Sequence, residues 1–218
     1  MRTIIVMMMV AVTIASLPIA LQDIDAHHYS QRRWEGTSVD LCYDSYSLRN
    51  LRIDGESNQY TKVKQQLDIA RNDWNDEPSR FTLNLIGGQY CRNWIYAAVL
   101  TNGEDKTAAA AMICVRQGSG ERCAIAELPH DFPTGSITRA SVTFNTRFDW
   151  FTTAICPSDP GIKQRTLSYV ARHEFGHWVS FDHTFGFPYE SVMYASYDCS
   201  SRNSVKPADS AELSSIYG

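Results

Sequence analysis

The chain has 218 residues, of which 44% are hydrophobic and 20% charged, and its formal net charge at pH 7 is -4. A chain of this length and composition can bury one core of ordinary size, so a single domain is expected. Acidic and basic residues are interspersed and form no basic stripe, which argues against nucleic acid or an anionic membrane surface as a partner.

The first residues have the pattern of a secretory signal peptide. Arg2 precedes an apolar stretch at residues 4–20 that is interrupted only by Thr13, Ser16 and Pro18. Residues 1–20 are therefore expected to be a signal peptide, with cleavage somewhere between residues 15 and 26. The alternative is an uncleaved membrane anchor, but the run is barely long enough to span a bilayer and contains a proline. We expect a secreted, extracellular protein with no membrane association after cleavage.

Six cysteines follow the signal: Cys42, Cys91, Cys114, Cys123, Cys156 and Cys199. An even number of cysteines in a secreted chain predicts three disulfides. Cysteine ligation of a metal would need pairs spaced by two to four residues, and no two cysteines are that close. The connectivity stays open, although Cys114 and Cys123 flank a turn-like Gln-Gly-Ser-Gly segment and could staple one hairpin.

Hydrophobic periodicity predicts strands and one helix in the first two thirds of the chain. Alternation of apolar with polar or small residues predicts strands at residues 39–43 and 81–86, and four further strand candidates lie at residues 94–100, 109–115, 123–128 and 137–144. Apolar residues recur every three or four positions from Tyr60 to Trp74, which predicts a helix capped by Ser57 or Asn58 and ended by Pro78. The alanine run at residues 108–111 would also suit a helix.

Two further helices are expected near the C-terminus. Asp159 followed by Pro160 has the pattern of a helix start, and the helix should continue to about Ser180. A short terminal helix is expected at residues 207–217.

The predicted helix before Ser180 contains His173-Glu174-Phe175-Gly176-His177. On a helix, side chains at positions i and i+4 project one above the other, so both imidazoles can reach one metal ion. Zinc suits such a pair, and Glu174 is placed to act on a zinc-bound water as general base rather than to bind the metal.

His183 follows His177 by six residues and can supply a third nitrogen. Three protein ligands leave the fourth zinc position for water, which is typical of a catalytic site. We therefore predict that His173, His177 and His183 bind one Zn²⁺, with Glu174 as the catalytic residue. Taken singly, each histidine would more often be a surface or core residue, but the joint spacing favours the metal site.

The segment from His173 to His183 reads H-E-F-G-H-W-V-S-F-D-H and resembles the zinc signature of the metzincin metallopeptidases, H-E-x-x-H-x-x-G-x-x-H. Ser180 stands where that signature has a glycine. A serine held at positive φ there would cost about 1 kcal/mol. Met193 resembles the methionine of the turn that underlies the metzincin zinc, where its role is structural.

Among the metzincins, the matrixins are the best match. Residues 193–197, Met-Tyr-Ala-Ser-Tyr, resemble the matrixin Met-Tyr-Pro-x-Tyr segment, with Ala195 in place of proline, and the last three residues resemble the matrixin Leu-Tyr-Gly. The resemblance implies an α+β fold for residues 27–218: a metzincin-like zincin domain with a twisted, mixed five-stranded sheet, an active-site helix and a C-terminal helix below the cleft. Neither the cysteine-containing latency segment nor a structural calcium site is recognisable.

The resemblance implies a secreted zinc metalloendopeptidase acting on protein or peptide substrates, and we expect a monomer. Substrate would lie extended beside the strand at residues 123–128, and Tyr194 and Tyr197 would border a substrate pocket or simply pack. Asp182 orients His183 or faces solvent, while His27, His28 and His130 are expected to be solvated residues. Two alternatives stay open: a secreted zinc-binding module without turnover, and a peptidase restricted to short or cell-wall peptides.

Overall fold

The structure, a computed structural model, describes residues 32–88, 90–101, 107–126, 134–155, 162–185, 190–196 and 202–218. Several sequence predictions fall outside these ranges. They concern the signal peptide and the individual residues His27, His28, His130, Cys156, Asp159, Pro160, Tyr197 and Cys199.

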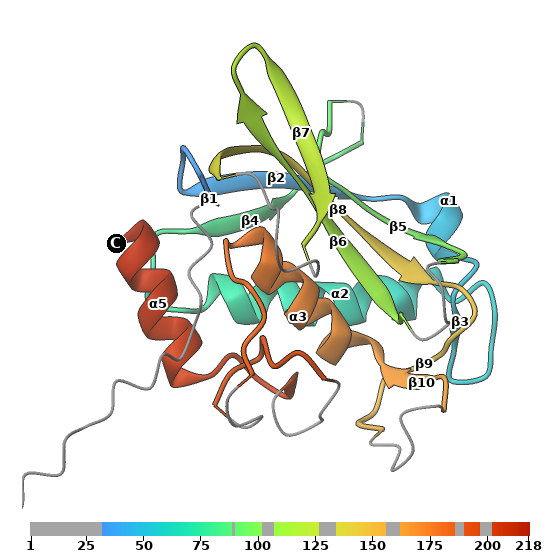
Figure 1. The fold of residues 1–218 in the computed structure, drawn as a ribbon. Coiled ribbons are helices and arrows are strands. Elements are labelled where there is room, and N and C mark those ends of the chain that lie inside the picture. The colour runs from blue at the N-terminus through green and yellow to red at the C-terminus, as the bar shows by residue number, and fades with distance from the viewer. Residues whose placement is uncertain are drawn as a thin grey trace, which may run out of the picture.

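A seven-stranded mixed sheet forms the body of the protein (Figure 1). Its strands are β1 (Arg32–Trp34), β2 (Ser38–Tyr43), β4 (Thr82–Leu85), β5 (Trp94–Ala98), β6 (Ala109–Gln117), β7 (Gly120–Ile125) and β8 (Gly135–Asn145). They lie in the order β4-β2-β5-β8-β6-β7, with β1 also paired to β8. β6 runs antiparallel to both of its neighbours, while the other pairings are parallel.

The α+β, metzincin-like fold is thus confirmed, but the sheet has seven strands rather than five. The turn between Gln117 and Gly120 contains Gly118 at φ 58° and returns the chain antiparallel, so that β7 pairs along β6. β1 has only three residues, too few to produce a readable alternation in the sequence. The ambiguous alanine run becomes part of β6 from Ala109 onward.

A second, three-stranded sheet was not expected from the sequence. It consists of β3 (Arg52–Ile53), β9 (Asp149–Phe151) and β10 (Gln164–Thr166), in the order β10-β9-β3 and with both pairings parallel. Strands of two or three residues leave no periodic signal, and only the tertiary pairing defines them.

The helices are α1 (Ser45–Leu48), α2 (Tyr60–Asn75), α3 (Leu167–Trp178) and α5 (Pro207–Tyr217). α2 and α3 lie together on one face of the sheet, and α5 lies beside them at one end (Figure 1). Apolar residues of α2 and α3, including Leu67, Val170 and Phe175, are fully or almost fully buried in the resulting core. No helix among the described residues is long and apolar enough to cross a bilayer.

The helix at residues 207–217 is confirmed, and α2 begins at Tyr60 as predicted, but the cap of α2 and the start of α3 were predicted wrongly. The cap of α2 is Gln59, because Asn58 has a φ of 62° instead of the extended conformation of an N-cap residue. α3 begins at Leu167 and not near Pro160, because Gln164–Thr166 pairs with β9 and must be extended. α3 ends at Trp178, two residues before the predicted end.

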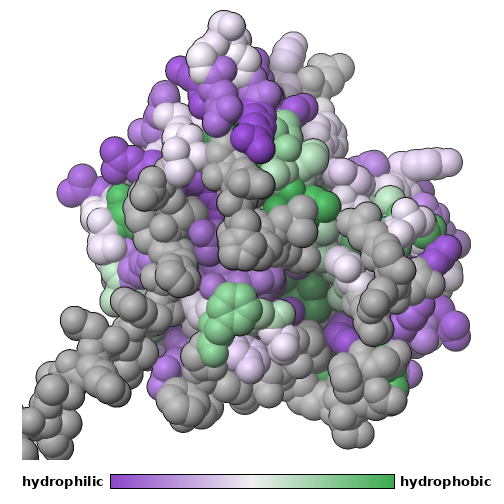
Figure 2. All heavy atoms as spheres, viewed as in Figure 1, coloured by the Kyte–Doolittle hydropathy of each residue, from purple (hydrophilic) through white to green (hydrophobic). Residues whose placement is uncertain are grey.

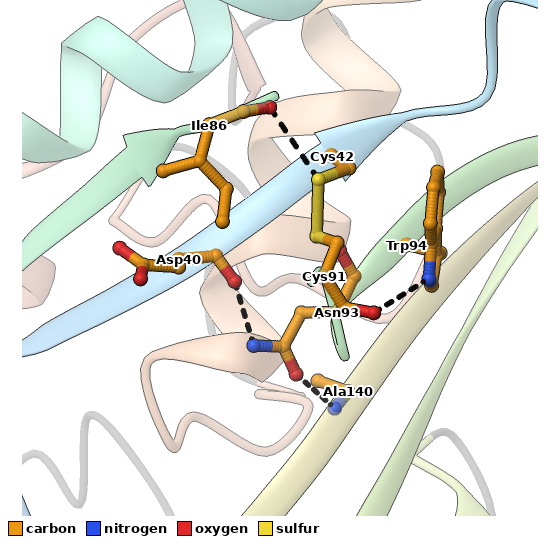
Figure 3. The surroundings of a disulfide bond; sticks show 7 residues. All are labelled: Asp40, Cys42, Ile86, Cys91, Asn93, Trp94 and Ala140. Atoms are coloured by element: carbon orange, nitrogen blue, oxygen red, sulfur yellow. Dashed lines mark hydrogen bonds between the residues drawn. A yellow bond between two sulfur atoms is a disulfide. The ribbon is translucent and has the colours of Figure 1, made fainter. Parts of the chain in front are cut away.

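Two disulfides lie among the described residues. Cys114–Cys123 joins directly paired positions of β6 and β7 and confirms the predicted hairpin staple. Cys42–Cys91 ties β2 to the segment before β5 (Figure 3). Beside it, the Asn93 amide donates to the Asp40 carbonyl at 2.7 Å and accepts from the Ala140 amide at 2.8 Å, so this side chain fastens β2 to β8.

Candidate metal centre

α3 carries three of the predicted site residues on its buried side. His173, Glu174 and His177 are each at most 2% exposed. The rings of His173 and His177 lie 5.0 Å apart between centroids, as expected for positions i and i+4 of one helix. His183 approaches from the segment after the helix, with its ring centroid 5.0 Å from that of His173 and 4.9 Å from that of His177. The structure therefore brings the three histidines together.

The hydrogen bonds of the two helical histidines fix which ring nitrogen faces the centre. Nδ1–H of His173 donates to the Val192 carbonyl, and Nδ1–H of His177 donates to the Phe181 carbonyl, both at 2.8 Å. Each Nε2 is then left with its lone pair. One possible ligand atom from each of the three histidines lies within 4.8 Å of the others, and Nε2 atoms of His173 and His183 are 3.0 Å apart.

This arrangement fits a divalent transition metal. Nε2 of His177 is buried and has no hydrogen-bond partner among the described residues. An orphaned buried nitrogen is costly unless it binds something. Three neutral imidazoles directed at one point are a ligand set that suits zinc, and two of them are oriented by backbone carbonyls, as metal-binding histidines usually are.

The surroundings keep the histidines neutral. Burial lowers the pKa of His173 and His177 well below the usual value, and the positive charge of Arg202 lowers both further. For His183, burial and then Arg202 lower the pKa to about 4. Neutral imidazoles can bind a metal without first losing a proton, so these shifts favour metal binding at neutral pH.

A Schellman turn redirects the chain from α3 to His183. The Phe181 amide donates to the Gly176 carbonyl at 3.0 Å, and the Ser180 amide donates to the His177 carbonyl at 3.2 Å. Ser180 occupies the left-handed position of this turn with φ 84°, as expected from its place at the glycine of the metzincin signature. Its hydroxyl is fully buried and lies 2.9 Å from the Tyr217 hydroxyl, so a hydrogen bond offsets part of the backbone strain.

Two substitutions of Ser180 separate the backbone strain from this hydrogen bond. Ser180→Ala and Ser180→Gly both lose the bond to Tyr217, but only alanine keeps a Cβ at positive φ. Ser180→Gly should therefore be more stable than Ser180→Ala by about 1 kcal/mol. Denaturant unfolding of both variants measures this difference, and equal stabilities would contradict a strained turn.

Met193 supports α3 from below. It is fully buried, and an added Cβ on Gly176 would lie 2.2 Å from its sulfur and 3.1 Å from the Trp74 ring. Gly176 therefore lies so close to the methionine turn, residues 191–194, that a side chain at this position would collide with Met193. Because the neighbouring Val192 carbonyl accepts the His173 hydrogen bond, this turn both supports the helix and orients one histidine.

α5 holds the methionine turn in place through Asp209. Its carboxylate accepts from the Ser191 hydroxyl at 2.7 Å, from the Val192 amide at 2.9 Å and from the Lys206 amide at 3.0 Å. Asp209 is fully buried, and burial raises its pKa, while these hydrogen bonds act in the opposite direction. The C-terminal helix thus contributes to the orientation of His173.

Glu212 lies one turn after Asp209 in α5, and its raised pKa predicts that the stability of the protein depends on pH. Burial, then the charges of Asp209 and Asp182, raise its pKa from 4.5 to about 7. Between these values the unfolded chain releases the Glu212 proton and the folded chain keeps it, so the free energy of unfolding falls as pH rises. Thermal unfolding from about pH 5 to about pH 8 should show a smaller decline in Glu212→Gln than in the wild type. Parallel curves for the two proteins would contradict this assignment.

The N-terminal strand β1 is tied to the loop that carries His183. Arg32 is 2% exposed and pairs with Asp182, the residue before His183. Trp34 Nε1–H donates to the Trp178 carbonyl at the end of α3 at 2.7 Å, and the Trp34 amide donates to the Tyr217 hydroxyl at 3.3 Å. Asp182 is therefore an anchor of the third-histidine loop.

Removal of this anchor should be costly. Asp182→Asn removes a countercharge of the buried Arg32 guanidinium, and about 2 kcal/mol of stability should be lost, since Asp182 is itself partly exposed. Zinc affinity should fall as well, because His183 loses its support. The matched control is Asp149→Asn, whose pair with Arg52 is exposed on both sides and should matter little. Denaturant unfolding and chelator competition report the two effects, and equal results for both variants would contradict the role of the pair.

A second buried arginine lies beneath the site. Arg172 of α3 pairs with Asp73 of α2 and donates to the Arg202 carbonyl. Arg202, 6% exposed, donates through Nη2 to the Tyr194 carbonyl at 3.1 Å. This chain of contacts joins both core helices to the segment after Met193. Tyr194 itself is part of a bridge to Thr184, so the segments around His183 and Met193 run side by side.

Sequence reasoning missed Arg32, Arg202 and Asp209 as supports of the site. Their partners lie far away in the chain, and no spacing rule reports such contacts. Gly176 could have been noticed, because a glycine inside a helix costs about 1 kcal/mol and usually has a packing reason.

The fold, and the centre that His173 and His177 of α3 form with His183, are those expected of a metzincin-like domain. Residues 116–218 match the sequence model of the matrixin family. The chain therefore contains a matrixin-like metallopeptidase domain, and the matched part includes the three histidines, Glu174, Met193 and α5. A comparison with curated proteins found no match.

Proposed function

We propose that this protein is a secreted zinc metalloendopeptidase in which His173, His177 and His183 hold one Zn²⁺. The observation that supports this proposal best is the convergence of three neutral imidazoles, one of them with an orphaned buried nitrogen, next to Glu174. The matrixin match adds the reaction class, hydrolysis of peptide bonds.

Zinc in this position would supply a Lewis acid that polarises the scissile carbonyl and lowers the pKa of water. Glu174 would accept a proton from the attacking water through its carboxylate and pass that proton to the departing amine nitrogen. The buried position of Glu174 favours this role, because a carboxylate shielded from solvent interacts more strongly with a nearby charge. The carbonyls of Val192 and Phe181 keep the histidine rings oriented throughout.

Substrate is proposed to lie extended along β7, the strand at one edge of the sheet. Among the described residues, the sheet order ends at this strand, and the Ala126 amide still pairs with the Ala111 carbonyl of β6. A peptide added to an exposed edge forms main-chain hydrogen bonds irrespective of its sequence. The segment after Met193, which includes Tyr194, would border the pocket for the residue after the cut.

Secretion remains a proposal from the sequence. The charged and apolar pattern of residues 1–20 supports it, and the Cys42–Cys91 and Cys114–Cys123 disulfides are what an oxidising compartment produces.

Hydrolysis of an unfolded protein tests the proposed activity. The purified protein should cleave casein, lose this activity with a zinc chelator and regain it when zinc is restored. Cleavage that persists after complete removal of metal would contradict the zinc mechanism. Bound zinc without cleavage of casein or of a broad peptide library would favour a binding module instead.

A further inference from the structure

The sheet face opposite α2 and α3 contains a hollow. Strand alternation directs Ile95 and Ile113 toward the core, and their neighbours Trp94, Tyr96 and Met112 toward the other face. These three side chains line a cavity of about 400 Å³ between β5, β6 and β8. Arg92, Arg139 and Asp44 also line it. A size of this order is sufficient for a small ligand or for one or two peptide side chains.

A second hollow of about 480 Å³ adjoins the first and shares Arg92 with it. Arg116 and the turn residues 118–120 of the β6–β7 hairpin line this second hollow. Together the two hollows extend from the middle of the sheet toward the hairpin. In the view of Figure 2, hydrophilic residues are prominent on the projecting hairpin, and hydrophobic patches lie lower on the molecule.

The charged side chains along these hollows differ in whether they form ion pairs. Arg116 pairs with Glu35 at 3.7 Å, and Arg139 pairs with Glu121 at 3.4 Å. The Asp44 carboxylate accepts a hydrogen bond from the Tyr46 amide as the cap of α1. Arg92 is exposed and has neither an ion pair nor a hydrogen bond within the described part of the chain. Of the three arginines that line the two hollows, Arg92 is therefore the one without an ion pair in the described part of the chain.

The floor of the first hollow is held rigidly. The Asn93 side chain, between Arg92 and Trp94, joins β2 to β8, and the Cys42–Cys91 disulfide lies directly beside it (Figure 3). Cys114, which lines the cavity, is joined to Cys123. A site that is already ordered loses little conformational entropy when a ligand binds.

The residue types match those at the centres of protein interfaces. Trp, Tyr, Met and Arg are enriched there, and hot spots are dominated by Trp, Tyr and Arg. The predominantly apolar wall of Trp94 and Met112 suits an aromatic or aliphatic side chain better than it suits a sugar.

We infer that this hollow binds an acidic peptide segment that carries an apolar side chain. The apolar side chain packs against Trp94 and Met112, and a neighbouring carboxylate pairs with Arg92. If the peptide is part of a substrate, the hollow is a second substrate contact, and this role rests on the proposed function. Binding of the peptide itself does not require catalysis.

Direct binding tests the inference without turnover. A fluorescently labelled peptide of alternating Glu and Phe is titrated against Glu174→Ala protein, and anisotropy is recorded. Arg92→Glu should weaken binding about tenfold or more, and added salt should weaken binding to the unsubstituted site. Met112→Ala should also weaken binding through the apolar contact. The matched control is Arg80→Glu, an exposed arginine after α2, which should bind as the parent does.

Equal affinity of the Arg92→Glu and Arg80→Glu proteins would overturn the inference, and so would equal binding of a Lys-Phe peptide. Arg92-dependent binding by a protein that hydrolyses nothing would uphold the site and refute the proposed peptidase. In an active enzyme, Arg92→Glu should raise KM for an acidic protein substrate and leave KM for a short uncharged peptide unchanged.

Discussion

Replacement of Glu174 by glutamine is expected to lower kcat for casein hydrolysis by about 10²–10⁴-fold, the usual contribution of a general base. Glutamine has nearly the same shape and keeps an acceptor oxygen, so the core around α3 should remain packed. Zinc content should stay at that of the wild type, since Glu174 is not among the three converging imidazoles. Steady-state kinetics and metal analysis of one preparation measure both properties.

The control for this prediction is Glu77→Gln, a carboxylate after α2, which should retain wild-type kcat. Loss of zinc from Glu174→Gln would place this residue among the metal ligands. Retention of wild-type kcat would show that another group moves the proton.

The second large effect is expected at His183. His183→Ala removes one of three converging ligands, and zinc affinity should fall about 100-fold or more. Zinc that binds the folded state raises its stability through mass action, so the increase in Tm on zinc addition should largely disappear in this variant. Chelator competition and thermal unfolding with and without zinc measure the change.

His130→Ala serves as the matched control, because the sequence assigns His130 to a solvated loop. Unchanged zinc affinity in His183→Ala would remove His183 from the centre and leave a two-histidine site. Similar losses in both variants would show that the effect is not specific to the centre.

The convergence of the three histidines could be predicted from the sequence because its signals are local. The spacing of His173 and His177 has meaning only on a helix, and helical periodicity near Val170 indicated that helix. His183 needs only a turn after the helix, and the positive φ expected at Ser180 is observed. Spacing of this kind carries three-dimensional information because helix geometry is fixed.

Other features could not be predicted because they depend on contacts between distant residues. The Arg32–Asp182 pair spans 150 positions, and the Ser191–Asp209 hydrogen bond joins two segments that show no shared pattern. At the start of α3, the local signal from Asp159 and Pro160 pointed to an earlier start. Pairing of β10 with β9 keeps residues 164–166 extended, so tertiary structure overrides the local preference.

The three histidines are oriented by contacts with residues from distant parts of the domain. β1 anchors Asp182, the methionine turn orients His173, and α5 holds that turn through Asp209. Each contact acts on one of the three histidines through a neighbour, in the way that groups behind the ligands set ligand orientation in metal sites. Residues from both ends of the described chain thus converge on one centre.

The most direct test of the account is a zinc titration of the metal-free protein, with casein hydrolysis and bound zinc measured on the same samples. The account predicts that hydrolysis rises in proportion to bound zinc and reaches its plateau at one zinc per chain. A protein that binds one zinc and hydrolyses nothing, or that hydrolyses casein equally well without zinc, would contradict it.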